Sequence, residues 1–328
     1  MKILVTGGLG FIGSNFILHA LQSKYKFRVT NIDACLPGSN MENVREVKIN
    51  RNYNYVKGNI TNKKTIEKLV SGSDVVINFA AESHVDRSIS DPLPFINSNI
   101  HGVYTILEAV RKYKKKLIQI STDEVFGSLK SSSATESYRY NPSSPYAASK
   151  AAAENLVNSY FITYDCDVIT TRCTNNYGPR QSPEKLIPKT ILLAKQNKKI
   201  PIYGTGKNIR DWIFVLDHCD AILKILFKGK SGESYNISTN NEVNNITIVK
   251  KILKIMGKSD DLIEFISDRP GHDFRYSLNS NKIRRELSWK PTHRFDDGLE
   301  KTIDWYQHNK EWRKNISNKM LTTFWKTR

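Results

Sequence analysis

Short apolar runs rich in β-branched residues alternate with helix-like stretches through the first half of the chain. These runs lie at residues 3–5, 29–32, 75–79, 117–120 and 168–171. Such alternation is typical of βαβ units, in which a crossover helix joins two parallel strands. The pattern therefore predicts an α/β fold with a doubly wound parallel sheet.

One helical stripe separates the third run from the fourth. Ile96, Ile100, Val103, Leu107 and Val110 recur at three- and four-residue steps, which places them on one face of a helix. A stripe of this kind either faces the core or forms the seam of a helix-bundle dimer. Both interpretations stay open at the level of sequence.

The sequence pattern changes after about residue 175, where prolines and glycines interrupt the alternation of strand-like and helix-like stretches. We expect a nucleotide-binding first domain over 1–175, with probable return segments near 211–240. The smaller C-terminal α/β domain would then comprise residues 176–210 and 241–328. Strand-like runs at 212–215 and 234–237 suggest that the chain crosses back to the first domain, and the last helix has an apolar face formed by Leu299, Ile303 and Tyr306.

Composition narrows the class of protein. The chain has 328 residues, 39% of them hydrophobic and 25% charged, which is ordinary for a globular protein. The net charge of +18 is spread along the chain, and its densest cluster, 111–116, fits the solvated end of a helix. We expect no nucleic-acid partner, and a phosphorylated substrate accounts for part of the charge.

Membrane, secretory and metal-binding classes are also disfavoured. We find no apolar stretch near the ~18 residues that a membrane span needs, and the N-terminus runs directly into a glycine turn without a signal-peptide pattern. The four cysteines, Cys35, Cys166, Cys173 and Cys219, lack the spacing of metal ligands. Reduced structural thiols, no metal and a cytoplasmic location are expected.

The first apolar run leads into the glycine-rich segment TGGLGFIGS. Gly7 would make the tight turn, Gly10 would let the backbone approach a pyrophosphate, and Gly13 would let the helix pack closely on the strand. Asp33 ends the next strand about 20 residues on, where a carboxylate accepts hydrogen bonds from a ribose and repels a 2′-phosphate. The segment predicts a Rossmann-type domain that binds NAD rather than NADP.

Two further segments carry candidate chemistry. Tyr146 and Lys150 lie in YAASK, at a spacing that places both side chains on one helix face. An ammonium beside a phenol lowers the pKa of the phenol and makes tyrosine usable as a base. Asp123 and Glu124 follow Thr122 in STDEVFG, at the predicted end of a strand. Paired carboxylates there indicate proton transfers in addition to hydride transfer.

The spacing G-x-x-G-x-x-G resembles that of extended short-chain dehydrogenases/reductases. Together, the motifs of the chain resemble those of the dTDP-glucose 4,6-dehydratase family, in the same order, from residue 2 to about residue 306. The matching segments are TGGLGFIGS, NFAAESHVDRS, STDEVFG, YAASK, NNYGPRQSPEKLIP, RDWIFVLDH and RPGHDFRY. Asp123 separates this family from its relatives most clearly.

The resemblance implies a lyase of deoxysugar biosynthesis, the rhamnose route included, that acts on the small-molecule substrate dTDP-glucose. Tyr146, assisted by Lys150 and Thr122, would take the proton of the sugar 4-hydroxyl while a hydride passes to NAD. Glu124 would remove the carbon 5 proton, and Asp123 would protonate the departing 6-hydroxyl. The hydride then returns to carbon 6, which yields the 4-keto-6-deoxy sugar without net use of NAD.

Site residues are also implied by matching motifs. The catalytic set is Thr122, Asp123, Glu124, Tyr146 and Lys150. Cofactor contacts are implied for Gly7, Gly10, Phe11, Ile12, Gly13, Asp33, Asn59, Ile60, Ala80, Ala81, Ser83, Ser98, Tyr146, Lys150 and Asn176. Substrate contacts are implied for His84, Thr122, Asn175, Glu184, Lys185, Leu186, Tyr203, Arg210, Asn245, Arg269, His272 and Tyr276.

Three residues depart from the family pattern. Asn59 stands in place of an aspartate that faces the adenine, Phe126 in place of a tyrosine, and Arg180 in place of a tyrosine or histidine. Arg180 would affect preference in the nucleotide site. The resemblance also implies a homodimer, in which the stripe and the helix after Tyr146 join a four-helix bundle.

Other functions stay open from the sequence. A UDP-sugar dehydratase, an epimerase or a decarboxylase of the same fold is the nearest alternative. A non-catalytic module that binds NAD or nucleic acid is a more distant one. The choice between thymidine and uridine nucleotides depends on loop geometry around residues 180–203.

Overall fold

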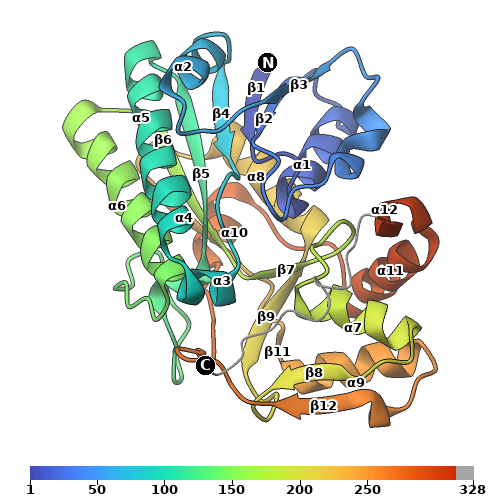
Figure 1. The fold of residues 1–328 in the computed structure, drawn as a ribbon. Helices are drawn as coiled ribbons and strands as arrows, with labels where there is room; N and C mark the ends of the chain where they lie inside the picture. Colours follow the sequence, from blue (N-terminus) through green and yellow to red (C-terminus); the bar gives the residue numbers. More distant parts are fainter. Residues whose placement is uncertain (315–328) are drawn as a thin grey trace.

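The computed structural model describes residues 1–314, and its main element is a large parallel sheet (Figure 1). The strands lie in the order β10-β6-β5-β4-β1-β2-β3, and every neighbouring pair is parallel. The predicted doubly wound Rossmann-type sheet is thus confirmed. Its strands are β1 Lys2–Thr6, β2 Arg28–Asp33, β3 Tyr53–Lys57, β4 Val75–Asn78, β5 Lys116–Thr122, β6 Val168–Cys173 and β10 Ser234–Ile237.

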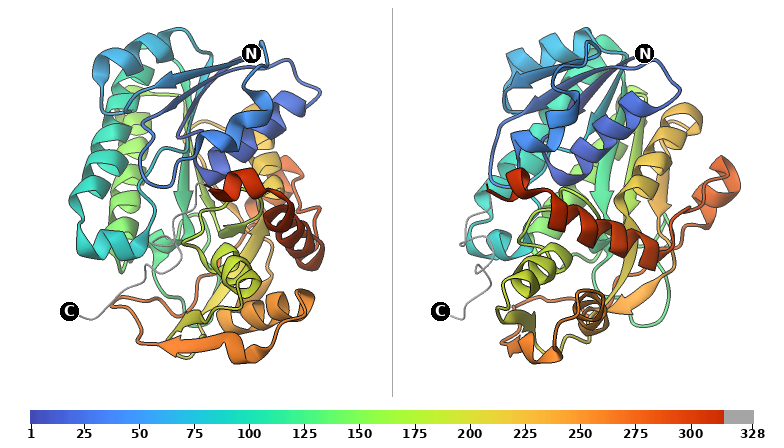
Figure 2. Two further views of the ribbon diagram at one scale, coloured as in Figure 1. Left: turned by 45° about the vertical axis from the view of Figure 1, so that its right-hand side comes forward. Right: turned by 90° about the vertical axis from the view of Figure 1, so that its right-hand side faces the viewer.

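Helices cover both faces of this sheet, as Figures 1 and 2 show. Alternate residues of β1 divide between the two layers, since Ile3 packs in one hydrophobic core with α1, α8 and α10, whereas Leu4 packs in another with α2, α5 and α6. The helices of the first layer are α1 Phe11–Gln22, α8 Val215–Lys228 and α10 Asn281–Leu287. Those of the second layer are α2 Lys63–Ser71, α5 Gly102–Tyr113 and α6 Pro145–Tyr164.

The apolar stripe predicted between the third and fourth runs belongs mainly to α5. Val103, Leu107 and Val110 are buried in the core between α5 and the sheet, whereas Ile96 is exposed. The core interpretation is correct for these three residues. Ile96 lies in a π-helical turn, Ile96–His101, that directly precedes α5.

A smaller region lies below the large sheet in Figure 1, and its apolar side chains pack in a third core. It contains a three-stranded sheet in the order β11-β9-β7 and a two-stranded pair of β12 and β8. Leu299, Ile303 and Tyr306 pack in this core, as the apolar face of the last predicted helix required. The elements are β7 Asn175–Tyr177, β8 Ile200–Tyr203, β9 Ile209–Phe214, β11 Glu242–Asn244, β12 Ile263–Ile266, α7 Leu186–Lys195, α9 Asn245–Ile255, α11 Phe295–His308 and α12 Lys310–Lys314.

The strand prediction was wrong at one run and incomplete elsewhere, since β3, β7, β8, β11 and β12 were not predicted. The strand-like run at 212–215 corresponds to β9, which pairs with β7 and β11 rather than with the large sheet; only β10 returns there. Strand β3 escaped prediction because it forms an edge of the sheet and is only half-buried, so it has no continuous apolar run. The expected domain boundaries remain a proposal, and residues 315–328 lie outside the described part of the chain.

The remaining elements are short and connect the main layers. They are α3 Val85–Ser90, α4 Leu93–Phe95 and three 3₁₀ turns at Met41–Val47, Asp123–Phe126 and Asp260–Leu262. Within the described residues, no helix has the length and apolar character needed to cross a membrane. All four cysteines are free; Cys166, Cys173 and Cys219 are buried, whereas Cys35 is exposed, with its sulfur 2.9 Å from the Tyr55 hydroxyl.

Candidate active site

The glycine loop joins β1 to α1 and brings three backbone segments into close contact. Gly7 has a φ of +69°, and a Cβ atom there would meet the Ala80 backbone at 2.7 Å. A Cβ atom at Gly13 would meet the Gly7 carbonyl oxygen at 2.6 Å. The loop therefore needs glycine at both positions, and the start of α1 faces the cavity beside it. Unpaired N–H groups at a helix N-terminus bind phosphate oxygens.

Asp33, at the end of β2, ties the loops around it together. Its carboxylate accepts hydrogen bonds from Leu9 N at 3.0 Å, Cys35 N at 2.8 Å and the Ser39 hydroxyl at 2.8 Å. These contacts hold the acid at the rim of the cavity. Oδ1 already accepts two of the three bonds, whereas Oδ2 accepts one and retains capacity for a ribose hydroxyl. The glycine loop with its phosphate-binding N–H groups and the Asp33 carboxylate with its capacity for a ribose hydroxyl together fit a dinucleotide.

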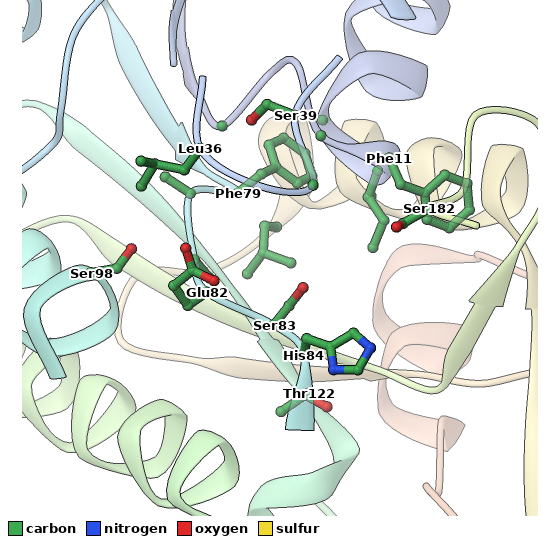
Figure 3. Close-up of a pocket in the computed structure, with 18 of the residues that line it drawn as sticks. Phe11, Leu36, Ser39, Phe79, Glu82, Ser83, His84, Ser98, Thr122 and Ser182 are labelled. Carbon is green, nitrogen blue, oxygen red and sulfur yellow. The ribbon is translucent and has the colours of Figure 1, made fainter. Parts of the chain in front are cut away.

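A deep cavity runs along the carboxyl ends of β1, β2, β4, β5 and β6. Figure 3 shows Ser39 and Phe11 at one end of it and His84 and Thr122 at the other. All residues predicted to contact the cofactor line it. The five predicted catalytic residues line it as well, so the structure brings the two sets together.

Thr122, Asp123 and Glu124 stand where β5 turns into a 3₁₀ turn. The Thr122 hydroxyl donates to Asp123 Oδ1 at 3.2 Å and accepts from Glu124 N at 3.3 Å. The other oxygen, Asp123 Oδ2, is buried and has no hydrogen-bond partner within the described residues. Burial and the nearby Glu124 carboxylate raise the pKa of Asp123 well above its ordinary value. Asp123 is therefore suited to act as a neutral proton donor.

The pKa of Glu124 is also raised, mainly by burial, although Arg269 and Lys185 oppose the shift. A carboxyl with a raised pKa holds a proton more firmly, so it can take up a proton and return it during one reaction cycle. Two neighbouring carboxyls with raised pKa values thus flank the end of β5.

Tyr146 and Lys150 lie on one face of α6, as predicted, but the expected electrostatics were wrong. Burial and Glu124 raise the pKa of Tyr146 instead of lowering it. The Lys150 ammonium donates to the Ile120 carbonyl oxygen at 2.6 Å, and burial lowers the pKa of Lys150 to about 8. Sequence spacing identified the pair correctly, but it contains no information about desolvation.

The predicted substrate contacts fall into two groups. One group lines the cavity: His84, Thr122, Asn175, Glu184 and Lys185. The other group lies outside the cavity lining: Leu186, Tyr203, Arg210, Asn245, Arg269, His272 and Tyr276. The cavity lining therefore contains five of the twelve predicted residues, and a substrate contact for the other seven stays a prediction.

Several members of the second group are linked to the cavity through residues that the sequence reasoning missed. Asp86, on α3, accepts hydrogen bonds from Arg269 at 2.5 Å and from the Tyr203 hydroxyl at 2.7 Å. Its neighbour Arg87 binds Glu184 at 2.6 Å. Asp86 and Arg87 lie in the segment NFAAESHVDRS, which is one of the segments that resemble family motifs. The residues that these two would contact, however, could not be predicted from the sequence.

Glu184 has a strongly perturbed carboxylate at the same edge of the cavity. It lies 3.0 Å from His84 Nε2 as well as close to Arg87. Burial alone would raise the pKa of Glu184, but these two residues outweigh burial and lower it to about 2. Glu184 is thus a fixed negative charge that orients His84 and Arg87.

The three departures from the family pattern have different environments. Asn59 lines the cavity, and its side-chain oxygen accepts from Thr61 N at 3.0 Å. Phe126 is buried under the Arg172 guanidinium, which lies 5.0 Å from the ring centroid. Arg180 was expected to affect the nucleotide site, but it lies outside the cavity lining and pairs with Glu46.

Fold and site together define a class of protein. A glycine loop after β1, a carboxylate at the end of β2 and a Tyr-x-x-x-Lys pair on α6 are the features of an extended short-chain dehydrogenase/reductase that uses a nicotinamide dinucleotide. The acids Asp123 and Glu124 add proton transfer to that chemistry.

Comparisons with known proteins narrow this class. Residues 4–302 match the family model described as GDP-mannose 4,6 dehydratase. A dTDP-glucose 4,6-dehydratase of Xanthomonas campestris is 44% identical, with 94% of each chain covered. The chain therefore belongs to this family of sugar-nucleotide 4,6-dehydratases.

Solved structures agree with this assignment. A dTDP-glucose 4,6-dehydratase from Streptomyces venezuelae with NAD and TYD bound has a TM-score of 0.93 and 39% identity, with 95% of this chain and 98% of that chain covered. A dTDP-glucose 4,6-dehydratase from Bacillus anthracis in complex with NAD has a TM-score of 0.90 and 46% identity, with the same coverage. The fold similarity thus extends over nearly the whole chain.

Proposed function

We propose that this protein is an NAD-dependent hydro-lyase that converts dTDP-glucose to dTDP-4-keto-6-deoxyglucose with loss of water. The observation that carries the proposal is the buried Asp123 carboxyl, whose raised pKa and unpartnered oxygen suit it to protonate a leaving hydroxyl. A simple dehydrogenase or epimerase has no need for such an acid. The relatives at more than 40% identity support the same substrate and reaction.

The glycine loop and Asp33 would hold NAD, which would supply an acceptor for the hydride of carbon 4 and a donor of that hydride to carbon 6 of the sugar. Tyr146 takes the proton of the 4-hydroxyl in its phenolate form and becomes a neutral phenol. Its raised pKa means that the phenol stays protonated until a charged neighbour stabilises the phenolate. Lys150, on the same face of α6, supplies this positive charge while its ammonium is protonated.

Glu124 takes the proton from carbon 5 once carbon 4 has become a ketone, because the ketone acidifies its neighbour. As the carbon 5–hydrogen bond breaks, its electron pair forms the bond between carbons 5 and 6. The bond between carbon 6 and its oxygen breaks, the oxygen leaves with the bonding pair, and Asp123 protonates it to water. Glu124 then returns a proton to carbon 5. Burial raises the pKa of both carboxyls, which favours the protonated form that each needs when it donates a proton.

Substrate recognition is assigned to the edge of the cavity around α3. His84, Glu184 and Lys185 line this edge, and Arg269 is held nearby by Asp86. A guanidinium binds a diphosphate through two parallel hydrogen bonds. We therefore assign Arg269 and Arg210 to the nucleotide diphosphate, and His84 with Asn175 to the sugar.

The direct test is incubation of the purified protein with dTDP-glucose without added reductant. The 4-keto-6-deoxy product should form, and it should form faster than the corresponding product from UDP-glucose. Absence of this product from both substrates would reject the proposal. Formation of the galactose epimer instead would favour an epimerase of the same fold.

We also infer a homodimer that forms through a four-helix bundle of α5 and α6 from each copy. Exposed apolar side chains support it: Leu93, Ile96, Tyr104 and Ile162 lie on or just before these helices, and Ile162 is 72% exposed. A solution mass twice that of the chain is expected, and Ile162→Asp should shift it towards one copy. A single-chain mass for the unmodified protein would contradict the dimer.

A cytoplasmic location and the lack of a nucleic-acid partner stay predictions. Four unpaired thiols fit a reducing compartment. Cell fractionation would test the location. Salt-dependent binding to random duplex DNA would contradict the second prediction.

A further inference from the structure

A line of hydrogen-bonded side chains runs from Glu124 towards the protein surface. The Tyr276 hydroxyl lies 3.4 Å from Glu124 Oε2 and donates to Asp273 Oδ2 at 2.8 Å. The Ser143 hydroxyl donates to the same Asp273 oxygen. Tyr276 and Asp273 are buried, whereas Ser143 is exposed. The line therefore connects a carboxyl of the cavity with solvent.

The surrounding contacts hold this line in place. The Arg210 guanidinium lies over the Tyr276 ring, 4.2 Å from its centroid, and donates to the Asp273 carbonyl oxygen at 2.9 Å. On the other side, the Ser128 hydroxyl accepts from Phe274 N at 3.1 Å. The segment that carries Asp273 and Tyr276 is thus fixed from two directions by groups that do not belong to the line.

Such a line matters because of the proton that Glu124 handles. In the proposed reaction, Glu124 takes a proton from carbon 5 and later returns one to the same carbon. A carboxyl enclosed by substrate returns the original proton unless a second route exchanges that proton with solvent. The hydrogen on carbon 5 of the product therefore reports whether such a route exists.

We propose that Tyr276 and Asp273 form a proton relay that connects Glu124 with solvent at Ser143. The relay rests on the proposed function, because it serves the carbon 5 proton of that reaction. Protonated Glu124 donates to the Tyr276 oxygen as the hydroxyl proton of Tyr276 moves to the Asp273 carboxylate. One proton is transferred, Tyr276 stays neutral throughout, and no electron changes place between the residues.

The distances favour this sequence of transfers, because the single hydrogen of the Tyr276 hydroxyl has its shorter contact with Asp273, at 2.8 Å, and its longer contact with Glu124, at 3.4 Å. Tyr276 donates to Asp273, so a lone pair on its oxygen can accept from Glu124. Asp273 then releases the proton to water beside the exposed Ser143, and reversal of the same steps recharges Glu124 with a solvent proton. Burial and Glu124 raise the pKa of Tyr276 well above its ordinary value, which agrees with a phenol that remains neutral.

The test follows the label on carbon 5. Substrate deuterated at carbon 5 is turned over in ordinary water, and the deuterium remaining in the 4-keto-6-deoxy product is measured by mass spectrometry. The unmodified protein should lose most of the label to solvent. Tyr276→Phe lacks the hydroxyl, so the product that it forms should retain most of the label. Asp273→Asn cannot accept the proton, and it should retain the label too.

The control variant is Ser128→Ala, which loosens the same segment but leaves the relay groups intact, so its product should lose the label as the unmodified protein's does. Label retention by Ser128→Ala would assign the effect to loosening of the segment and overturn the relay. Equal label loss in the unmodified protein and both relay variants would overturn it too. If Tyr276→Phe makes no product, the deuterium retained in the product of Asp273→Asn tests the relay by itself. If the unmodified protein makes no ketone at all, the proposed function fails first.

Discussion

Asp86 and Arg269, 183 residues apart in the chain, form a direct ion pair with an oxygen–nitrogen distance of 2.5 Å. Asp86 lies on α3 beside the large sheet, and Arg269 follows β12 in the smaller region. Burial alone would raise the pKa of Asp86, but Arg269 and Tyr203 outweigh it and hold the pKa below its ordinary value. The pair thus positions Arg269, which we assign to the nucleotide diphosphate.

Asp86→Asn is expected to weaken substrate binding more than it slows the reaction. Loss of a charged hydrogen bond costs about 1.5–3 kcal/mol, which corresponds to a roughly 10- to 100-fold increase in KM for dTDP-glucose. The value of kcat should change much less, because the variant leaves the groups at β5 and α6 in place. Steady-state kinetics separates the two quantities.

Asp91→Asn is a suitable control, since Asp91 follows α3 and is exposed. It should leave both kinetic constants unchanged. A fall in kcat without a change in KM for Asp86→Asn would mean that the ion pair serves the chemical step instead of binding.

The contrast between this ion pair and the cofactor loop shows which parts of the site the sequence could predict. Gly7, Gly13 and Asp33 act through a local strand–turn–helix geometry, so about thirty residues of sequence contain the whole signal. Asp86 and Arg269 meet only because the smaller region folds back over α3. No local sequence pattern specifies that contact, so the sequence around Asp86 does not reveal that its partner is Arg269.

The acid–base groups show a second limit. Sequence spacing placed Tyr146 and Lys150 on one helix face, and the structure agrees. Their pKa values, however, depend on how completely β5, β6 and α6 remove water from them. Burial is a property of the packed layers, so the sequence predicted a lowered phenol pKa where the structure gives a raised one.

Asp123→Asn should separate a dehydratase from an epimerase. The amide keeps the shape of the side chain but cannot protonate a leaving hydroxyl, and loss of a general acid typically costs about 10²- to 10⁴-fold in rate. Formation of the 4-keto-6-deoxy product should fall by this factor, while NAD binding measured by calorimetry stays the same. An epimerase would instead form galactose epimer at nearly the unmodified rate.

Activity should decline above about pH 8 as Lys150 loses its proton. Burial lowers the pKa of Lys150 to about 8, although Glu154 and Cys173 oppose the shift, and a neutral amine no longer stabilises the Tyr146 phenolate. The measurement is kcat/KM for dTDP-glucose as a function of pH, which reports groups of the free enzyme. A profile that stays flat or rises up to pH 10 would contradict this role of Lys150.

The same shift predicts the sign of a change in stability. Lys150 has a pKa of about 8 when folded and an ordinary value of 10.5, so the unfolded chain binds more protons between these values. The free energy of unfolding should therefore gain a contribution from Lys150 as pH rises through this window. Urea unfolding at several pH values would show the gain, and Lys150→Met should remove it.

Removal of either partner of the buried Glu154–Arg172 pair should strongly lower the free energy of unfolding. Their side chains are 1% and 3% exposed and lie 2.6 Å apart, and Tyr140 donates to the same carboxylate at 2.8 Å. Glu154→Leu leaves an unpaired buried guanidinium, which typically costs about 3–5 kcal/mol of unfolding free energy. Urea denaturation measures this loss.

Two comparisons identify the cause of that loss. Replacing both charges, as Glu154→Leu with Arg172→Met, should cost less than Glu154→Leu alone, because no unpaired charge then remains buried. Asp260→Asn breaks the exposed pair with Lys250, whose side chains are more than half exposed, and should cost less than about 1 kcal/mol. Suppose instead that Glu154→Leu is no more destabilising than Asp260→Asn. The Glu154–Arg172 pair would then contribute little to the free energy of unfolding, and packing of the Arg172 guanidinium against Phe126 would have to account for its burial.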